Sequence, residues 1–264
     1  MQVRGEVVVI TGGANGIGRA LCDAMHAAEA RSVVVADLDI ERAREVADRV
    51  GGVAVKCDVT CEDDVRALIA DTEARLGPIG LFCSNAGVMV GVDMRCENVA
   101  GASNDHWERS WQVNVMAHVY AARELVPRMR TRGGGYFLNT VSAAGVLSAV
   151  GSATYSATKH AAIGFAESLA IAHRAHGVHV SVLCPQAVDT QLLPREAGGL
   201  LLGDGVLSPD EVAKAALAGI EEEAFLILPH PVVRDYMRGK VENYDHWIGG
   251  MAKIQARLRG GVPA

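Results

Sequence analysis

The sequence has few aromatic residues and no long apolar run. Only 5% of its 264 residues are aromatic, although half are hydrophobic. Its apolar runs reach the length of a strand, well short of the roughly 20 residues that a membrane-spanning helix needs. The first run begins within a few residues of Met1 and leaves no room for a secretory signal, so we expect a cytoplasmic protein. The net charge of −6 includes no basic stripe, which argues against nucleic-acid binding.

The sequence also lacks a metal-binding or disulfide pattern. None of the six cysteines forms a C-x-x-C pair, and Cys57, Cys83 and Cys184 fall in or beside apolar strand-like runs. Reduced cysteines in a protein core are therefore expected. The histidine-rich run from His173 to His179 has no cysteine or carboxylate at zinc-ligand spacing, so no metal site is expected.

Strand-like and helix-like stretches alternate along the whole chain, and alanine, valine and glycine are abundant. The expected strands cover residues 6–11, 32–36, 53–57, 79–84, 136–141, 178–184 and 224–228. The expected helices cover residues 19–30, 40–50, 61–76, 105–130, 153–176 and 208–223. This alternation predicts an α/β fold with one doubly wound parallel seven-stranded sheet and helices on both faces. No repeat or linker interrupts it, so we expect a single domain over residues 1–264.

A glycine-rich loop separates the first expected strand from the first helix. It reads Gly12-Gly-Ala-Asn15-Gly16-Ile17-Gly18. Strand, glycine loop and helix in this order are typical of a pyrophosphate site, because glycines allow close backbone approach and the helix N-terminus offers free N–H groups. A tight turn without a ligand is the alternative.

Asp37 ends the second expected strand, and Leu38 follows it. A carboxylate there can accept hydrogen bonds from the ribose hydroxyls of a dinucleotide and would repel a 2′-phosphate. Because no arginine follows it, we expect NAD rather than NADP. The alternative is that Asp37 only caps the next helix.

Tyr155 and Lys159 lie four residues apart in an expected helix, and therefore on one face of it. A nearby ammonium favours the phenolate and lowers a tyrosine pKa from about 10 by about 1–3 pH units. Such a tyrosine can exchange a proton near neutral pH, which the interconversion of an alcohol and a ketone requires. A contact on the helix surface is the alternative.

These candidate residues lie at or just beyond the carboxyl ends of expected strands, where open α/β sheets bind ligands. Over nearly its whole length the chain resembles the short-chain dehydrogenase/reductase family. The pattern T-G-x-x-x-G-x-G spans Thr11–Gly18, N-A-G is Asn85-Ala86-Gly87, and Y-x-x-x-K spans Tyr155–Lys159. The family's serine matches Ser142, thirteen residues before the tyrosine, and its helix asparagine matches Asn114.

The resemblance implies a Rossmann-like fold and a role for each matched residue. Tyr155 would be the general acid/base, Ser142 would polarise the substrate oxygen, and Lys159 would lower the tyrosine pKa and hold the nicotinamide ribose. Asn114 would hold a water molecule that relays protons. The cofactor would be bound by Gly12, Asn15, Gly16, Ile17, Gly18, Asp37, Leu38, Asp58, Val59, Asn85, Ala86, Gly87, Tyr155, Lys159, Pro185, Val188 and Thr190.

Two segments are expected to shape the substrate site. Residues 186–207 are expected to form a lid over the substrate. They are rich in leucine, and Arg195 is their only basic residue, so a mostly apolar secondary alcohol or ketone is expected. Gln186 replaces the family's usual glycine. The tail, residues 231–264, predicts an amphipathic helix with a break at Gly249-Gly250, which packs on its own domain, contacts another subunit or covers the substrate.

The sequence therefore predicts an NAD-dependent alcohol dehydrogenase or ketone reductase, which the resemblance implies is a homotetramer or homodimer. The alternatives are an NADP-preferring reductase, an imine or enoyl reductase, and an inactive protein that only senses dinucleotides. A complete set of Asn114, Ser142, Tyr155 and Lys159 speaks against the sensor, which would not need a proton-transfer tyrosine.

Overall fold

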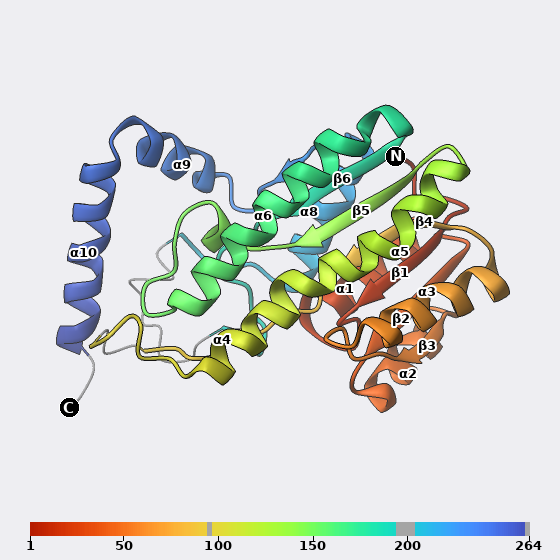
Figure 1. Cartoon of the computed structure of the whole chain (residues 1–264), viewed down its shortest axis with the longest axis horizontal. Helices are drawn as coiled ribbons and strands as arrows, with labels where there is room; N and C mark the ends of the chain where they lie inside the picture. Colours follow the sequence, from red (N-terminus) through yellow and green to blue (C-terminus); the bar gives the residue numbers. More distant parts are fainter. Residues whose placement is uncertain (94–96, 194–203, 262–264) are drawn as a thin grey trace.

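Seven parallel strands form one sheet at the centre of the molecule (Figure 1). The structure is a computed structural model and describes residues 1–93, 97–193 and 204–261. The sheet has the order β3-β2-β1-β4-β5-β6-β7. Its strands are β1 Val7–Thr11, β2 Ser32–Asp37, β3 Val53–Lys56, β4 Ile79–Ser84, β5 Gly135–Thr140, β6 Val178–Leu183 and β7 Leu226–Ile227.

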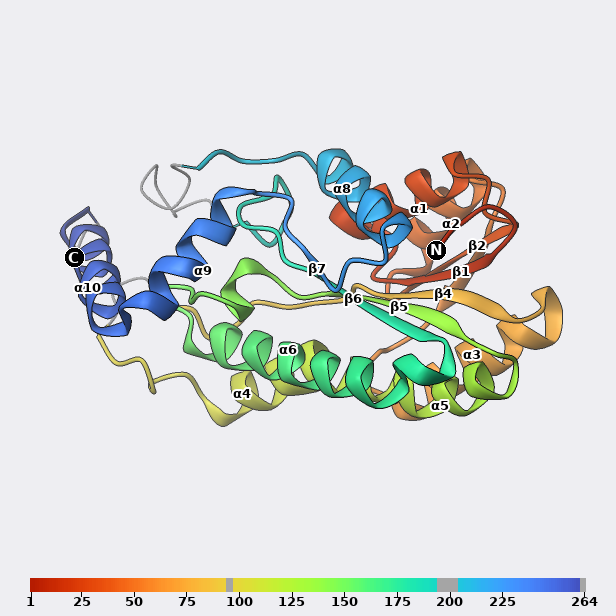
Figure 2. The ribbon, with the colours of Figure 1, turned by 90° about the horizontal axis from the view of Figure 1, so that it is seen from above.

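Helices cover both faces of the sheet, as Figure 2 shows. One face carries α1 Gly16–Ala27, α2 Ile40–Arg49 and α8 Pro209–Glu221. The other carries α3 Glu62–Leu76, α4 Asn104–Trp111, α5 Ala117–Thr131 and α6 Ala153–His173. Alternate strand residues point into two apolar clusters, one on each face, as the valine-rich strands require. The predicted Rossmann-like doubly wound fold is confirmed.

The strand order reverses between β1 and β4, which are neighbours although β2 and β3 separate them in the sequence. In an open α/β sheet the loops beyond such a pair diverge to opposite faces and leave a crevice. The glycine loop after β1 and Asn85 after β4 both lie at this position.

Two predicted elements differ from the structure. The helix expected over residues 105–130 is interrupted by a π-helical turn, Gln112–Met116, because the buried Asn114 side chain bonds outside the helix, to Val88 and Thr158. The last strand is shorter than expected, because β7 pairs with β6 over two residues only at the sheet edge.

The C-terminal tail forms two helices, α9 Val232–Glu242 and α10 Tyr244–Gly261, beyond the carboxyl edge of the sheet (Figures 1 and 2). The predicted break at Gly249-Gly250 is wrong, because both glycines lie within α10. The break is at Asn243, whose extended backbone ends α9 and whose side-chain oxygen accepts the His246 N–H at the start of α10.

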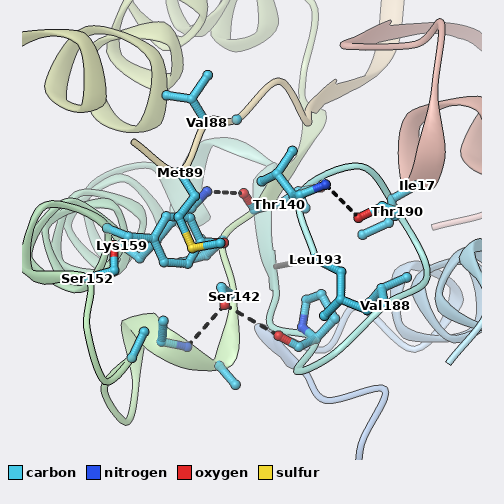
Figure 3. A pocket seen from close by; sticks show the side chains of 18 of the residues that line it. Ile17, Val88, Met89, Thr140, Ser142, Ser152, Lys159, Val188, Thr190 and Leu193 are labelled. Carbon is cyan, nitrogen blue, oxygen red and sulfur yellow. Dashed lines mark hydrogen bonds between the residues drawn. The ribbon is translucent and has the colours of Figure 1, made fainter. Parts of the chain in front are cut away.

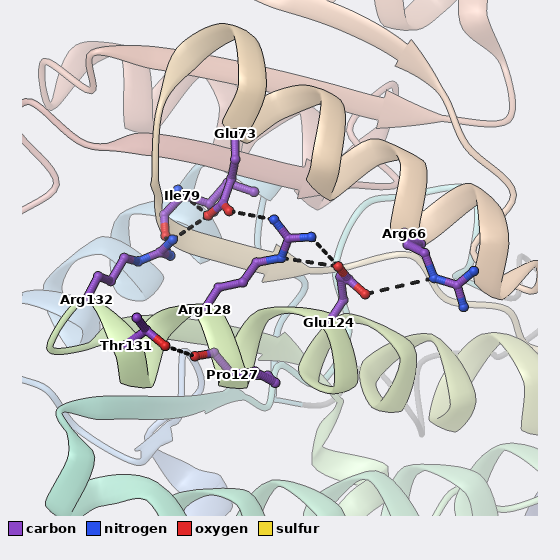
Figure 4. A network of polar contacts seen from close by, with 8 residues as sticks. All are labelled: Arg66, Glu73, Ile79, Glu124, Pro127, Arg128, Thr131 and Arg132. Carbon is purple, nitrogen blue, oxygen red and sulfur yellow. Dashed lines mark hydrogen bonds and ion pairs between the residues drawn. The ribbon is translucent and has the colours of Figure 1, made fainter.

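An ion-pair network joins α3 to α5 (Figure 4). Glu73 of α3 pairs with Arg128 and Arg132 of α5, and Arg128 also pairs with Glu124. Burial alone would raise the pKa of Glu73, but hydrogen bonds from the two arginines bring it below its usual value. None of these residues lines the pocket described below, so we assign the network to stability.

Candidate active site

A pocket of about 880 Å³ lies at the carboxyl edge of the sheet (Figure 3). It is lined by every residue that the sequence assigned to catalysis or cofactor binding, apart from Asn114. The glycine loop, the end of β2, the ends of β4 and β5 and the first turn of α6 therefore converge on one cavity, as the sheet topology requires.

The glycine loop is shaped for close backbone approach. Gly12 and Gly16 have φ of +63° and +49°, the left-handed region that favours glycine. A Cβ at Gly12 would lie 2.9 Å from the Ala86 Cα, and a Cβ at Gly18 would collide with the Gly12 carbonyl. The loop opens directly into α1, whose first N–H groups are free to bind an anion.

Asp37 is held by the loop itself. One carboxylate oxygen accepts the Ala14 N–H at 3.0 Å and the other accepts the Asp39 N–H at 3.0 Å. Asp39, and not Asp37, caps α2, since its side chain accepts the Arg42 N–H. The capping alternative for Asp37 is therefore wrong, and its carboxylate is fixed at the pocket wall beside Leu38.

Arg42 was missed by the sequence reasoning, which considered only the position after Asp37. It reaches from α2 to the Asn15 side-chain oxygen at 3.2 Å and pairs with Asp39 at 3.4 Å. A search for an arginine directly after Asp37 does not find Arg42, which comes later in the sequence. The first turn of α2 nevertheless brings its side chain to the glycine loop.

Asp58 and Val59, which the resemblance assigned to cofactor binding, line the same pocket. The Asp58 carboxylate accepts hydrogen bonds from the Thr60 N–H at 2.9 Å and the Thr60 hydroxyl at 2.7 Å. Burial alone would raise the pKa of Asp58, but these bonds and the Arg109 charge lower it. Asp58 is therefore a stable anion and acceptor.

Asn85 ties the end of β4 to the glycine loop. Its side-chain nitrogen donates to the carbonyls of Thr11 and Gly12 at 3.1 and 3.3 Å, and its N–H donates to the Thr11 hydroxyl at 3.0 Å. These bonds position Asn85, Ala86 and Gly87 against the loop.

Ser142, Tyr155 and Lys159 meet at the middle of the pocket. The Ser142 hydroxyl donates to the Pro185 carbonyl at 3.4 Å and accepts the Ala144 N–H at 3.1 Å (Figure 3). Lys159 donates to the Thr140 carbonyl at 3.2 Å, and its Nζ lies 5.5 Å from the centre of the Tyr155 ring.

The expected lowering of the Tyr155 pKa is not found. Burial raises the pKa of the Tyr155 phenol, and the hydrogen bond with Ser142 opposes this only in part. The Lys159 ammonium lies over the ring and donates to the Thr140 carbonyl, and it makes no hydrogen bond with the phenol. Burial also lowers the pKa of Lys159 to about 8, since its side chain is only 2% exposed.

Asn114 lies behind the pocket wall rather than in it. Its side-chain oxygen accepts the Val88 N–H at 3.0 Å, and its nitrogen donates to the Val88 carbonyl at 2.9 Å and the Thr158 hydroxyl at 3.2 Å. The amide group thus locks the loop after β4 to α6. The role of Asn114 in holding a water molecule stays a prediction.

The substrate side of the pocket is mostly apolar, and its outer wall comes from α10. Trp247, Met251 and Ile254 line it together with Val88, Met89, Val92, Leu147, Leu192 and Leu193. The three-residue spacing of apolar residues in the tail predicted an amphipathic helix, but nothing in the sequence showed that this face meets the pocket. The proposed lid falls in part on residues 194–203, which lie outside the described residues.

Gln186 joins a polar cluster at the same end of the pocket. Its side-chain nitrogen donates to Asp204 at 3.2 Å, and the Tyr236 hydroxyl donates to the other Asp204 oxygen at 2.8 Å. The Gln186 N–H donates to Nδ1 of the buried His230 at 3.2 Å. The residue that replaces the family's glycine thus connects the end of β6 with α9.

Within residues 1–93, 97–193 and 204–261, no cluster of side chains is suited to hold a metal ion. His179 of the histidine run pairs instead with Glu223 at 3.1 Å and stacks on Tyr136.

Comparison with known proteins agrees with this geometry. Residues 6–197 match the family model for short chain dehydrogenases. The chain is 34% identical over 254 residues to 1-deoxy-11-beta-hydroxypentalenate dehydrogenase of Streptomyces exfoliatus, which covers 92% of this chain and 90% of that protein. It is 30% identical over 236 residues to (+)-borneol dehydrogenase 1 of Salvia officinalis, which covers 84% of this chain and 89% of that protein.

A solved short-chain dehydrogenase/reductase from Burkholderia phymatum, in complex with NAD, superposes with a TM-score of 0.82 at 28% identity. The match covers 93% of this chain and 96% of the Burkholderia chain. The family model, the dehydrogenase relatives and the shared fold together show that this chain belongs to the short-chain dehydrogenase/reductase family and is an oxidoreductase that acts on CH–OH groups.

Proposed function

We propose that the protein is an NAD-dependent dehydrogenase that interconverts a mostly apolar secondary alcohol and its ketone, with Tyr155 as general acid/base. The observation that carries this proposal is the convergence of Ser142, Tyr155 and Lys159 with the glycine loop and Asp37 on one pocket. A dinucleotide-sensing protein would need the loop and Asp37 but not the other three.

The residues present fit a nicotinamide dinucleotide. The left-handed turns at Gly12 and Gly16 give a cradle that side chains would fill, and the N-terminus of α1 faces the same pocket. Asp37, Asp58 and Asn85 would hold the adenosine half, and Lys159, Val188 and Thr190 would hold the nicotinamide half. When bound, the cofactor would supply the acceptor for the hydride.

Tyr155 would take the proton of the substrate hydroxyl during oxidation and return it during reduction. Ser142 would turn its hydroxyl from the Pro185 carbonyl to the same substrate oxygen, donate to it and orient it. The charge of Lys159 would stabilise the phenolate that forms. Because burial raises the pKa of Tyr155, oxidation should speed up as the pH rises toward that pKa.

NAD is favoured over NADP by Asp37. Its carboxylate is fixed by two N–H groups at the pocket wall, where it would repel a 2′-phosphate. The Arg42 guanidinium at the glycine loop is paired with Asp39 and bonded to Asn15.

An alicyclic alcohol is the substrate class that the pocket supports best. Its substrate side combines apolar side chains from the loop after β4, from α10 and from Leu147, and these suit a bulky hydrocarbon frame. The relatives named above act on a hydroxypentalenate and on borneol, a bicyclic alcohol.

A substrate and cofactor panel tests this function. Bicyclic secondary alcohols with NAD should produce NADH, followed by its absorbance, and NAD should raise the thermal midpoint of the protein more than NADP at equal concentration. Turnover of no alcohol in the panel would point to another reaction or to a sensor. A larger thermal shift with NADP would refute the Asp37 argument.

Assembly into a homotetramer or homodimer through the helical segments that carry Asn114 and Tyr155 is also proposed. Trp111 on α4 is 46% exposed and Ile171 on α6 is 83% exposed, and large apolar side chains on a surface favour association. A cytoplasmic location stays a prediction. No helix in the described part of the chain is both long and apolar enough to cross a bilayer.

A further inference from the structure

Ser152 is an N-terminal cap residue that does not cap. It directly precedes α6, where a serine side chain usually accepts an N–H from the first turn. Here the side chain makes no such bond. The main chain of Ser152 is nevertheless paired, since its N–H donates to the Ala149 carbonyl and its carbonyl accepts the Ser156 N–H. Only the hydroxyl is left over.

The Ser152 hydroxyl is buried at the wall of the active-site pocket. The residue is 2% exposed, it lines the pocket, and its Oγ has no hydrogen-bond partner among the described residues. Figure 3 shows Ser152 on the same side of the pocket as Lys159 and Met89. A buried hydroxyl without a hydrogen-bond partner lowers the stability of the folded chain. A partner for the Ser152 hydroxyl would have to come from outside the chain, as a bound ligand does.

The surroundings of Ser152 are fixed, so the hydroxyl is preorganised. The Asp93 N–H donates to the carbonyl of Gly151 at 2.7 Å, and the Thr154 hydroxyl donates to the Val90 carbonyl at 2.6 Å. These bonds hold the loop after β4 against the start of α6 on both sides of Ser152. A ligand would therefore meet this hydroxyl without first having to order it.

Two other pocket residues have a buried polar atom without a partner in the described structure, Thr140 at Oγ1 and Gln186 at Oε1. Thr140 is the residue whose carbonyl binds Lys159, and we assign it to the cofactor half. Gln186 is tied to Asp204, which directly follows residues outside the described part of the chain. Of the three, Ser152 alone directly precedes the helix that carries the reacting tyrosine.

Ser152 precedes Tyr155 by three residues, and both residues line the same pocket. One small substrate frame would then carry an oxygen bound by Tyr155 and a second oxygen bound by Ser152. Diols and hydroxyketones carry two such oxygens on one frame.

We propose that Ser152 binds a second oxygen function of the substrate, which makes the preferred substrate a diol or hydroxyketone on an alicyclic frame. The proposal rests on the function proposed above and adds a specificity-determining residue to it. The hydroxyl of Ser152 can donate to a ketone or accept from an alcohol, so it serves both oxidation states of the second group.

The test compares decahydronaphthalene-2,3-diol with decahydro-2-naphthol, which lacks the second hydroxyl, using NAD and the variant Ser152→Ala. We expect kcat/KM for the diol to fall about tenfold, as for one lost hydrogen bond, and that for the mono-alcohol to stay within about twofold. The thermal midpoint should not fall, because no cap is lost. Ser168→Ala, an exposed serine outside the pocket on the same helix, is the matched control.

A binding measurement separates this proposal from the proposed function. In the Tyr155→Phe background, which removes proton transfer, the diol should stabilise the NAD-bound protein more than the mono-alcohol does, and Ser152→Ala should abolish the difference. If no alcohol is oxidised but this difference holds, the assigned reaction fails and the role of Ser152 stands. Equal effects of Ser152→Ala on both compounds, or no effect on either compound in both measurements, would overturn the role of Ser152.

Discussion

Lys159 and His118 are two buried basic side chains behind the reacting tyrosine. Lys159 is almost fully buried. Burial, with a smaller effect of the Lys159 charge, lowers the pKa of His118, on α5, to about 3. The His118 Nδ1 is hydrogen-bonded with the Ser84 hydroxyl at 2.7 Å. A neutral histidine here leaves Lys159 as the positive charge next to Tyr155.

This burial makes stability depend on pH. The pKa of His118 is about 3 in the folded chain and its ordinary value is 6.5, so the unfolded chain binds a proton first as the pH falls. The folded state should therefore lose up to about 1.4 kcal/mol for each pH unit between 6.5 and 3 from this residue. Denaturant titrations at several pH values should show a flatter dependence for His118→Asn. An equally steep slope in that variant would contradict the assignment.

Residue spacing alone could predict some of the site. The glycine loop, Asp37 and the Tyr155–Lys159 pair follow from the physical chemistry of phosphates, ribose and phenols. Ser142 and Asn114 came only with the family resemblance. The unused hydroxyl of Ser152 and the low pKa of His118 could not be predicted, because burial and hydrogen-bond partners depend on residues far apart in the sequence.

The helices α9 and α10 contact the loop that follows Ser142, and Lys240 makes hydrogen bonds to it. Lys240 of α9 is 8% exposed, and its ammonium donates to the carbonyls of Val146 and Leu147 at 3.0 and 2.8 Å. These residues follow Ser142 by one short turn. Trp247 of α10 packs on the same apolar cluster as Leu147. The tail is thus positioned relative to the reacting centre by direct contacts.

Trimming this wall should affect the substrate and spare the cofactor. Trp247→Ala removes apolar area from the pocket, so KM for a bicyclic alcohol should rise about tenfold while KM for NAD stays within about twofold. Ile248→Ala changes an exposed neighbour on the same helix and should leave both constants unchanged. Steady-state kinetics with each substrate varied in turn gives both values. An equal loss for NAD would mean that α10 supports the whole domain.

The sequence could predict most elements, because apolar periodicity and the glycine and proline positions mark them locally. It could not predict the π-helical turn at Asn114 or the break at Asn243. Both are decided by a side chain that bonds to main-chain groups, and Asn114 does so across elements. At Gly249 and Gly250 the sequence predicted a break that the structure does not have. Glycine lowers helix propensity, but packing of the helix face keeps both residues in α10.

In the whole molecule, the reaction centre lies where the order of the strands in the sheet reverses. In the proposed function, the cofactor half of the pocket is built by β1, β2 and β4 with their loops and by residues after β6, and the substrate half by the loop after β4, Leu147 and the C-terminal helices. Tyr155 lies between them on α6. The fold thus separates binding of the dinucleotide, which all family members share, from recognition of the alcohol, which the tail and Ser152 would determine.

Tyr155→Phe tests the central claim most directly, because it removes one oxygen and leaves both halves of the pocket in place. With the alcohol that the wild-type chain oxidises best, kcat should fall about a hundred- to ten-thousandfold, while the affinity for NAD, measured by calorimetry, stays within about twofold. Turnover within tenfold of the wild type, with NAD binding intact, would contradict the role of Tyr155 as general acid/base.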